Sequence, residues 1–139
     1  MDRRSFLAGS LAFAATGPGA AGAAGNKAMK ILLITGSPRK NGNSNTLASH
    51  FARGAQEAGH ELARFDCAFK DVHPCTACNS CGMDGPCVFQ DDFDFVRGHI
   101  VQADLVAFAS PMYYFGFSAQ LKAVIDRFYA INGQIHMPK

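Results

Sequence analysis

The sequence predicts an α/β fold in which helices cover both faces of a parallel sheet, giving three layers. Two short apolar runs carry this prediction, at residues 31–34 and 105–109, because strands buried on both faces have this composition. Stretches with helical periodicity follow both runs, and alternation of strand and helix implies parallel strands. The chain has 139 residues, 48% of them hydrophobic, which suits one domain with its own core.

The first helix is expected between the polar loop 37–43 and Gly59, because glycine commonly follows the last turn of a helix. Ser44 or Asn45 is expected to cap its start, since such side chains accept hydrogen bonds from the free N–H groups of a first turn. The apolar face of this helix is expected to comprise Leu47, Phe51, Ala55 and Ala58.

The remaining elements follow in the order strand, helix, strand, helix. Residues 60–66 alternate weakly and indicate a second strand. Asp91 or Asp92 is expected to cap the next helix, and Ser118 the last one. The apolar faces of these two helices comprise Phe93, Val96, Ile100 and Val101, and then Leu121, Val124, Ile125 and Phe128.

No strand follows the last helix, although a helix in a parallel sheet normally returns the chain to it. The sequence therefore predicts that the C-terminal strands are missing, or that a partner covers the third strand. Without either cover, that strand would be an exposed apolar edge.

The charge distribution argues against nucleic acid as a partner. The formal net charge is +2, 17% of the residues are charged, and no basic run or stripe occurs.

The first 28 residues have the pattern of a secretory signal and linker. Arg3 and Arg4 precede an apolar centre at 6–15, and small residues follow at 17–25. Paired arginines before Ser-Phe-Leu resemble a twin-arginine signal, which predicts export to the periplasm. The apolar centre is too short and too rich in Gly and Ala for a stable membrane span. The alternative is a cytoplasmic protein that starts at Met29. In either case the domain is expected at 29–139.

The loop 36–46, between the first strand and first helix, is the predicted phosphate site. A helix N-terminus attracts anions, and the hydroxyls of Ser37, Ser44 and Thr46 and the charge of Arg39 could add contacts. The glycine patterns of Walker A and dinucleotide loops are both absent. A single phosphate, such as that of FMN, therefore fits best, with an ordinary polar loop as the alternative.

Four cysteines form a compact motif, Cys75-x2-Cys78-x2-Cys81-x5-Cys87. This spacing could hold a [4Fe–4S] cluster in one loop. Zinc bound by four thiolates, redox-active or structural thiols, and disulfides remain open alternatives. Cys67 stands apart at a strand end and is expected to be a small buried apolar residue.

Two segments resemble the NADPH-dependent FMN reductase and iron–sulfur flavoprotein group of the flavodoxin-like superfamily. They are Gly-Ser-Pro-Arg-Lys-Asn-Gly-Asn-Ser from Gly36, and Ser-Pro-Met-Tyr-Tyr-Phe from Ser110 with the following helix. The resemblance covers about 29–139 and implies a flavodoxin-like, doubly wound sheet. It also implies an FMN phosphate loop formed by Ser37, Arg39, Asn43, Ser44, Asn45 and Thr46. The loop along the flavin ring would comprise Pro111, Met112, Tyr113, Tyr114 and Phe115.

The resemblance further implies an FMN-dependent oxidoreductase that passes electrons from NAD(P)H or a protein donor to a flavin, quinone or other acceptor. It implies a homo-oligomer and, at the four cysteines, a [4Fe–4S] cluster beside FMN. The alternatives are an electron-transfer flavoprotein without a small-molecule substrate, and an inactive truncated remnant. Members of this group continue with two more strands and a final helix, so a third flavin loop is expected to be missing here. The catalytic residues are not identified by the sequence.

Overall fold

The computed structural model describes residues 27–136, so most of the predicted signal segment, residues 1–26, lies outside the described residues. Three strands form one parallel sheet in the order β2-β1-β3. Their bounds are β1 Lys30–Thr35, β2 Glu61–Asp66 and β3 Leu105–Ala109. The three predicted strands and the parallel α/β class are confirmed.

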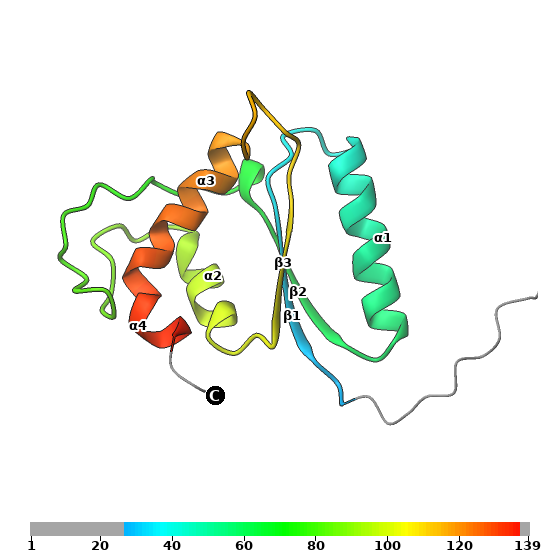
Figure 1. Ribbon diagram of the computed structural model, residues 1–139, viewed down its shortest axis with the longest axis horizontal. Helices are drawn as coiled ribbons and strands as arrows, with labels where there is room; N and C mark the ends of the chain where they lie inside the picture. The colour runs from blue at the N-terminus through cyan, green and yellow to red at the C-terminus, as the bar shows by residue number, and fades with distance from the viewer. Residues whose placement is uncertain (1–26, 137–139) are drawn as a thin grey trace, which may run out of the picture.

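Helices lie on both faces of this sheet (Figure 1). Helix α1, on one side, and helices α2 and α3, on the other, are separated by the sheet. The helix bounds are α1 Asn43–Glu57, α2 Phe93–Ile100, α3 Ala119–Asp126 and the short α4 Asn132–Ile135. Two 3₁₀ turns, η1 Cys67–Phe69 and η2 Arg127–Ile131, complete the regular structure of residues 27–136. The three-layer arrangement is therefore confirmed.

The main core lies between the sheet and helices α2 and α3. Leu32 and Ile34 alternate along β1 and pack with Phe93, Val96 and Leu121, all nearly or fully buried. The predicted apolar faces of α2 and α3 are confirmed, because Phe93, Val96 and Ile100 of α2 and Leu121 and Val124 of α3 are buried.

The predicted apolar face of α1 was wrong in all but one residue. Helix α1 buries Ala48 and Ala55 together with Asn45, whereas Leu47 and Phe51 are 69% and 40% exposed. The Asn45 amide donates to the Arg39 carbonyl at 2.8 Å, and this bond turns that side of α1 toward the protein. A polar contact to the preceding loop therefore sets the rotation of the helix, not the larger apolar residues.

The predicted cap of α1 was also wrong. The N-cap residue is Gly42, and no side chain caps the helix. Ser118 does cap α3, since its Oγ accepts a hydrogen bond from the Leu121 N–H at 3.4 Å. Asp92 is the N-cap residue of α2, and the neighbouring Asp91 carboxylate accepts from the Phe93 N–H at 3.1 Å.

Strand β3 is an edge strand of the described sheet and is partly exposed, as predicted. Leu105 and Phe108 are 41% and 43% exposed. No described helix is long and apolar enough to cross a membrane.

Candidate functional site

The loops that follow β1 and β3 meet at the carboxyl edge of the sheet, where open α/β sheets bind ligands (Figure 1). The Gly36 N–H donates to the Ala109 carbonyl at 2.8 Å. A Cβ atom at position 36 would lie 2.4 Å from Ser118 Oγ and 2.8 Å from Leu121 Cβ. The missing side chain of Gly36 thus allows the first loop to lie directly against the start of α3.

The start of α1 presents open hydrogen-bond donors to this edge. Gly42 is the N-cap, and the Thr46 N–H donates to its carbonyl at 2.9 Å. Within the described residues, the N–H groups of Asn43, Ser44 and Asn45 have no acceptor. With the positive end of the helix dipole, these three donors suit a phosphate group.

The side chains of Ser37 and Asn45 shape the loop from within. Both residues are almost fully buried. Ser37 Oγ accepts from the Arg39 N–H at 3.3 Å, and the Asn45 amide holds the Arg39 carbonyl. Asn45 thus acts on this loop through its side chain as a support, while its backbone N–H stays open to a ligand.

A single open cleft joins the two predicted loops. Predicted residues that line it are Ser37, Arg39, Asn43, Ser44, Pro111 and Tyr113. Asn41 and Gly42, which were not among the predicted site residues, also line it. Asn45 and Thr46 instead line a separate groove along α1, with Lys40 and Arg53. Met112, Tyr114 and Phe115 do not line the cleft and are at least 75% exposed.

The loop after β3 makes a tight turn at Tyr113–Gly116, closed by reciprocal hydrogen bonds between these two residues at 2.9 and 3.1 Å. Tyr114 and Phe115 occupy its centre with φ values of 45° and 64°. Both positive values define a type I′ turn, which bulky side chains rarely adopt. The turn leaves Tyr113 at the cleft and projects the other two rings into solvent.

The cleft fits a flavin mononucleotide on two observations. The open N–H groups of Asn43 and Ser44, two residues that line it, lie at its phosphate end. Gly42 has no side chain that would crowd the loop, since a Cβ there would lie 3.1 Å from Arg39 Cβ.

The four cysteines of the motif line one pocket, together with Arg127 and Tyr129. Cys75 and Cys78 are exposed and Cys81 and Cys87 partly buried, all as free thiols. Among the described residues, no three His, Cys, Asp or Glu side chains are grouped closely enough to hold a metal ion as they stand. The structure thus brings the four predicted ligands to one pocket without giving them metal-binding geometry.

The loop that carries the four cysteines, residues 71–92 between η1 and α2, is called the cysteine loop; it and the turn after β3 both contain strained backbone. Within residues 27–136, every non-glycine residue with positive φ lies in one of these two loops. They are Ala77, Asn79, Met83, Tyr114 and Phe115. Such conformations persist only where surrounding structure imposes them, and they gather at functional sites.

Two thiols differ sharply in chemistry. Hydrogen bonds from Ser80 lower the pKa of Cys78, which favours the nucleophilic thiolate. Burial raises the pKa of Cys67 to about 12. Cys67 is therefore a buried residue, as predicted, whereas Cys78 is exposed and has a more acidic thiol.

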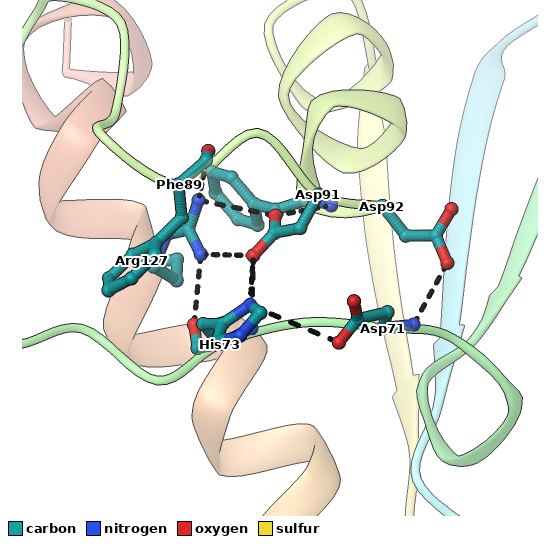
Figure 2. Close-up of polar contacts among 7 residues, drawn as sticks. Asp71, His73, Phe89, Asp91, Asp92 and Arg127 are labelled. Atoms are coloured by element: carbon teal, nitrogen blue, oxygen red, sulfur yellow. Dashed lines mark hydrogen bonds and ion pairs between the residues drawn. The ribbon is translucent and has the colours of Figure 1, made fainter.

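A buried ion pair closes the base of the cysteine loop (Figure 2). Arg127 donates through Nη1 to an oxygen of Asp91 at 2.7 Å and to the His73 carbonyl at 2.9 Å. Its Nη2 donates to the Phe89 carbonyl at 3.4 Å. The Arg127 and Asp91 side chains are 1% and 2% exposed. One guanidinium thus holds both ends of the loop.

The same carboxylate accepts hydrogen bonds from the His73 N–H at 3.0 Å and the Phe93 N–H at 3.1 Å. Burial by itself would raise the pKa of Asp91, but the hydrogen bonds from Arg127, His73 and Phe93 outweigh it. The pKa of this carboxyl is therefore held below its usual value.

Sequence reasoning missed this network and assigned Asp91 only to helix capping. The partners of Arg127 lie 36 to 54 residues away in the chain. The available signal was the adjacency of two acidic residues to the end of a cysteine loop. That signal does not identify a cation contributed by another helix.

The family model described as NADPH-dependent FMN reductase matches residues 29–137. The chain belongs to the NADPH-dependent FMN reductase family. The match includes the phosphate loop, the cysteine loop and the turn after β3.

Proteins similar in sequence to this chain include iron–sulfur flavoproteins. One from Methanocaldococcus jannaschii is 38% identical over 99 residues, which cover 71% of this chain and 51% of the relative. One from Archaeoglobus fulgidus is 36% identical, covering 71% and 45%. An NAD(P)H:quinone oxidoreductase from Methanothermobacter marburgensis shares the fold, with a TM-score of 0.61 and 22% identity over 73% of this chain and 54% of that one.

The chain spans about half the length of the curated relatives it matches.

Proposed function

We propose that this protein is an FMN-dependent oxidoreductase that takes electrons from NAD(P)H and delivers them to a flavin, quinone or other acceptor. The observation that carries the proposal is the cleft where the open N–H groups of α1 meet Pro111 and Tyr113. Family membership supports the same cofactor.

Different residues of the cleft would bind the phosphate and the flavin ring of FMN. The N–H groups of Asn43 and Ser44 and the exposed Arg39 would hold the phosphate. Pro111 and Tyr113 would lie along the flavin ring, where backbone amides and an aromatic side chain can contact its edge and face. Bound FMN would supply the electron transfer, and these residues would orient it.

Binding of FMN and riboflavin to the full chain tests the proposal, because riboflavin lacks the phosphate. Quenching of flavin fluorescence should show FMN binding at least about tenfold more tightly, since charge-assisted contacts to the phosphate are worth that factor or more. Arg39→Gln should weaken FMN binding and leave riboflavin binding nearly unchanged.

Lys40→Gln is the matched control, since Lys40 is the adjacent cation but lies in the groove along α1, outside the cleft. Equal affinity for FMN and riboflavin would contradict the phosphate site. Absence of flavin binding would favour the inactive remnant. Oxidation of NADPH by the FMN-loaded protein, with a quinone as acceptor, tests the proposed donor and acceptor.

A second candidate function is electron transfer through a cluster held by the four cysteines. The pocket that all four line favours it, and relatives named iron–sulfur flavoproteins support it. Anaerobic reconstitution with iron and sulfide should then give broad absorbance near 400 nm and about four iron atoms per chain. Zinc uptake with no iron, or neither metal, would reject the cluster.

We also propose export through the twin-arginine pair, which precedes the described residues. Replacing Arg3 and Arg4 together with lysine in a bacterial host that has this pathway should retain the protein in the cytoplasm. An unchanged distribution on fractionation would support the start at Met29.

A further inference from the structure

The cysteine loop rests on one segment of the chain, residues 127–134. Arg127 holds the base of the loop at His73 and Phe89. Further along the segment, the Tyr129 hydroxyl donates to Asn79 Oδ1 at 2.9 Å. Gly133 and Gln134 donate to the carbonyls of Met83 and Asp84 at 3.2 and 3.1 Å.

These contacts fall on strained parts of the loop. Asn79 and Met83 have positive φ, and each is bonded by this segment. A Cβ at Gly133 would lie 3.1 Å from the Asp84 side chain, so the loop lies directly against the segment here. The segment therefore imposes the conformation of the loop that carries the cysteines.

One donor of Arg127 remains without a partner. Its Nε–H is buried and donates to no acceptor among the described residues, although Arg127 lines the pocket of the four cysteines. An unpartnered N–H on a buried cation is costly, so such a donor in a native protein calls for an acceptor. A thiolate or sulfide at this pocket is an acceptor of the right charge.

We propose that Arg127 is a positioning residue for the four cysteines and that its Nε–H donates to sulfur in the loaded pocket. This inference rests on the proposed cluster. Arg127 closes the loop through its Nη atoms, and Tyr129 supports the loop at Asn79. Hydrogen bonds to sulfur raise the reduction potential of a cluster, so Arg127 also tunes it.

Hydrogen exchange of the full, metal-free chain tests the positioning role. Arg127→Lys keeps the charge but cannot bridge two carbonyls and a carboxylate, so exchange across residues 71–92 should rise by about tenfold or more. Exchange in β1 and FMN affinity should stay near wild type. Lys122→Met removes an exposed cation from the same side of the molecule and is the matched control.

Tyr129→Phe provides a variant that keeps the buried ion pair. It should raise exchange around Asn79 by a few fold and leave the base of the loop unchanged. Should Arg127→Lys fail to fold, this variant decides the positioning role of the segment. Unchanged exchange of the loop in both variants, or in Tyr129→Phe alone where Arg127→Lys does not fold, would overturn the proposal.

The midpoint potential of the reconstituted cluster tests the donor to sulfur. Arg127→Lys should lower this potential relative to wild type and Lys122→Met. An equal potential in all three proteins would remove the tuning role. A wild-type chain that binds FMN but takes up no iron and sulfide would reject both the cluster and the tuning role of Arg127. The hydrogen-exchange experiment would still test whether Arg127 and Tyr129 hold the cysteine loop in place.

Discussion

At the scale of single residues, Gly36 joins the two halves of the cleft. Its absent side chain leaves room for Ser118 Oγ and Leu121 Cβ. Gly36→Ala should destabilise the protein by about 1–3 kcal/mol, because the added methyl group overpacks a close contact between loop and helix. It should also weaken FMN binding. Urea unfolding followed by circular dichroism measures the first effect.

Gly54→Ala is the matched control for this prediction. Gly54 lies within α1, and a Cβ there meets nothing within 4 Å. This change should stabilise the protein by roughly 0.5–1 kcal/mol, because alanine is a better helix former. Equal effects of the two substitutions would show that Gly36 is not sterically required.

Asp91 predicts a specific loss of stability in acid. Its pKa is lowered in the folded protein, so between the folded and unfolded pKa values the unfolded chain binds more protons. The contribution of Asp91 is therefore present above the unfolded pKa, about 4, and is lost as the pH falls through the folded pKa.

Asp91→Asn tests this loss. It should cost about 3–5 kcal/mol at pH 7, since it breaks one side of a buried ion pair, and the difference from wild type should shrink below about pH 4. Unfolding free energies measured from pH 7 to pH 3 give the comparison. Asp94→Asn, an exposed change in the same helix, serves as the control. A difference for Asp91→Asn that stays constant across this range would contradict the assignment.

At the scale of elements, the two helices that follow the loops of the cleft start in different ways. Helix α3 has a side-chain cap from Ser118, whereas α1 begins at Gly42 with its first N–H groups open. The capped helix fixes the loop after β3, and the uncapped helix keeps its donors for a ligand.

Ser118→Ala should therefore destabilise the ligand-free protein by about 1 kcal/mol, because the Leu121 N–H loses its acceptor. Ser44→Ala should change the stability by less than about 0.5 kcal/mol, since Ser44 caps nothing. Thermal unfolding of the two variants compares them. A larger loss for Ser44→Ala would mean that Ser44 caps α1 after all.

At the scale of the whole molecule, the cleft links cofactor binding to stability. The loops after β1 and β3 are far apart in the chain, and only folding brings them together. A ligand that contacts both loops therefore stabilises only the folded state. FMN at a hundred times its dissociation constant should add about 2.7 kcal/mol and raise the melting temperature by roughly 10 °C. Riboflavin at the same concentration should raise it less. A melting temperature that FMN leaves unchanged would argue against the cleft.

The sequence by itself determined the α/β class, the three strands, the apolar faces of α2 and α3, and the first loop of the cleft, whereas the loop after β3 was implied by the resemblance to a known family. These depend on local patterns: continuous apolar runs, helical periodicity, and a glycine- and hydroxyl-rich loop before a helix. The sequence also places the four cysteines close together in the chain, so that all four can line one pocket.

Only the tertiary structure decided the rotation of α1, the outward direction of Tyr114 and Phe115, and the role of Arg127. Each depends on a contact that periodicity does not encode. The Asn45 amide orients α1 through the Arg39 carbonyl, and a type I′ turn directs the two rings. Arg127 lies on the chain well after the cysteine loop, and only folding brings its guanidinium between both ends of that loop.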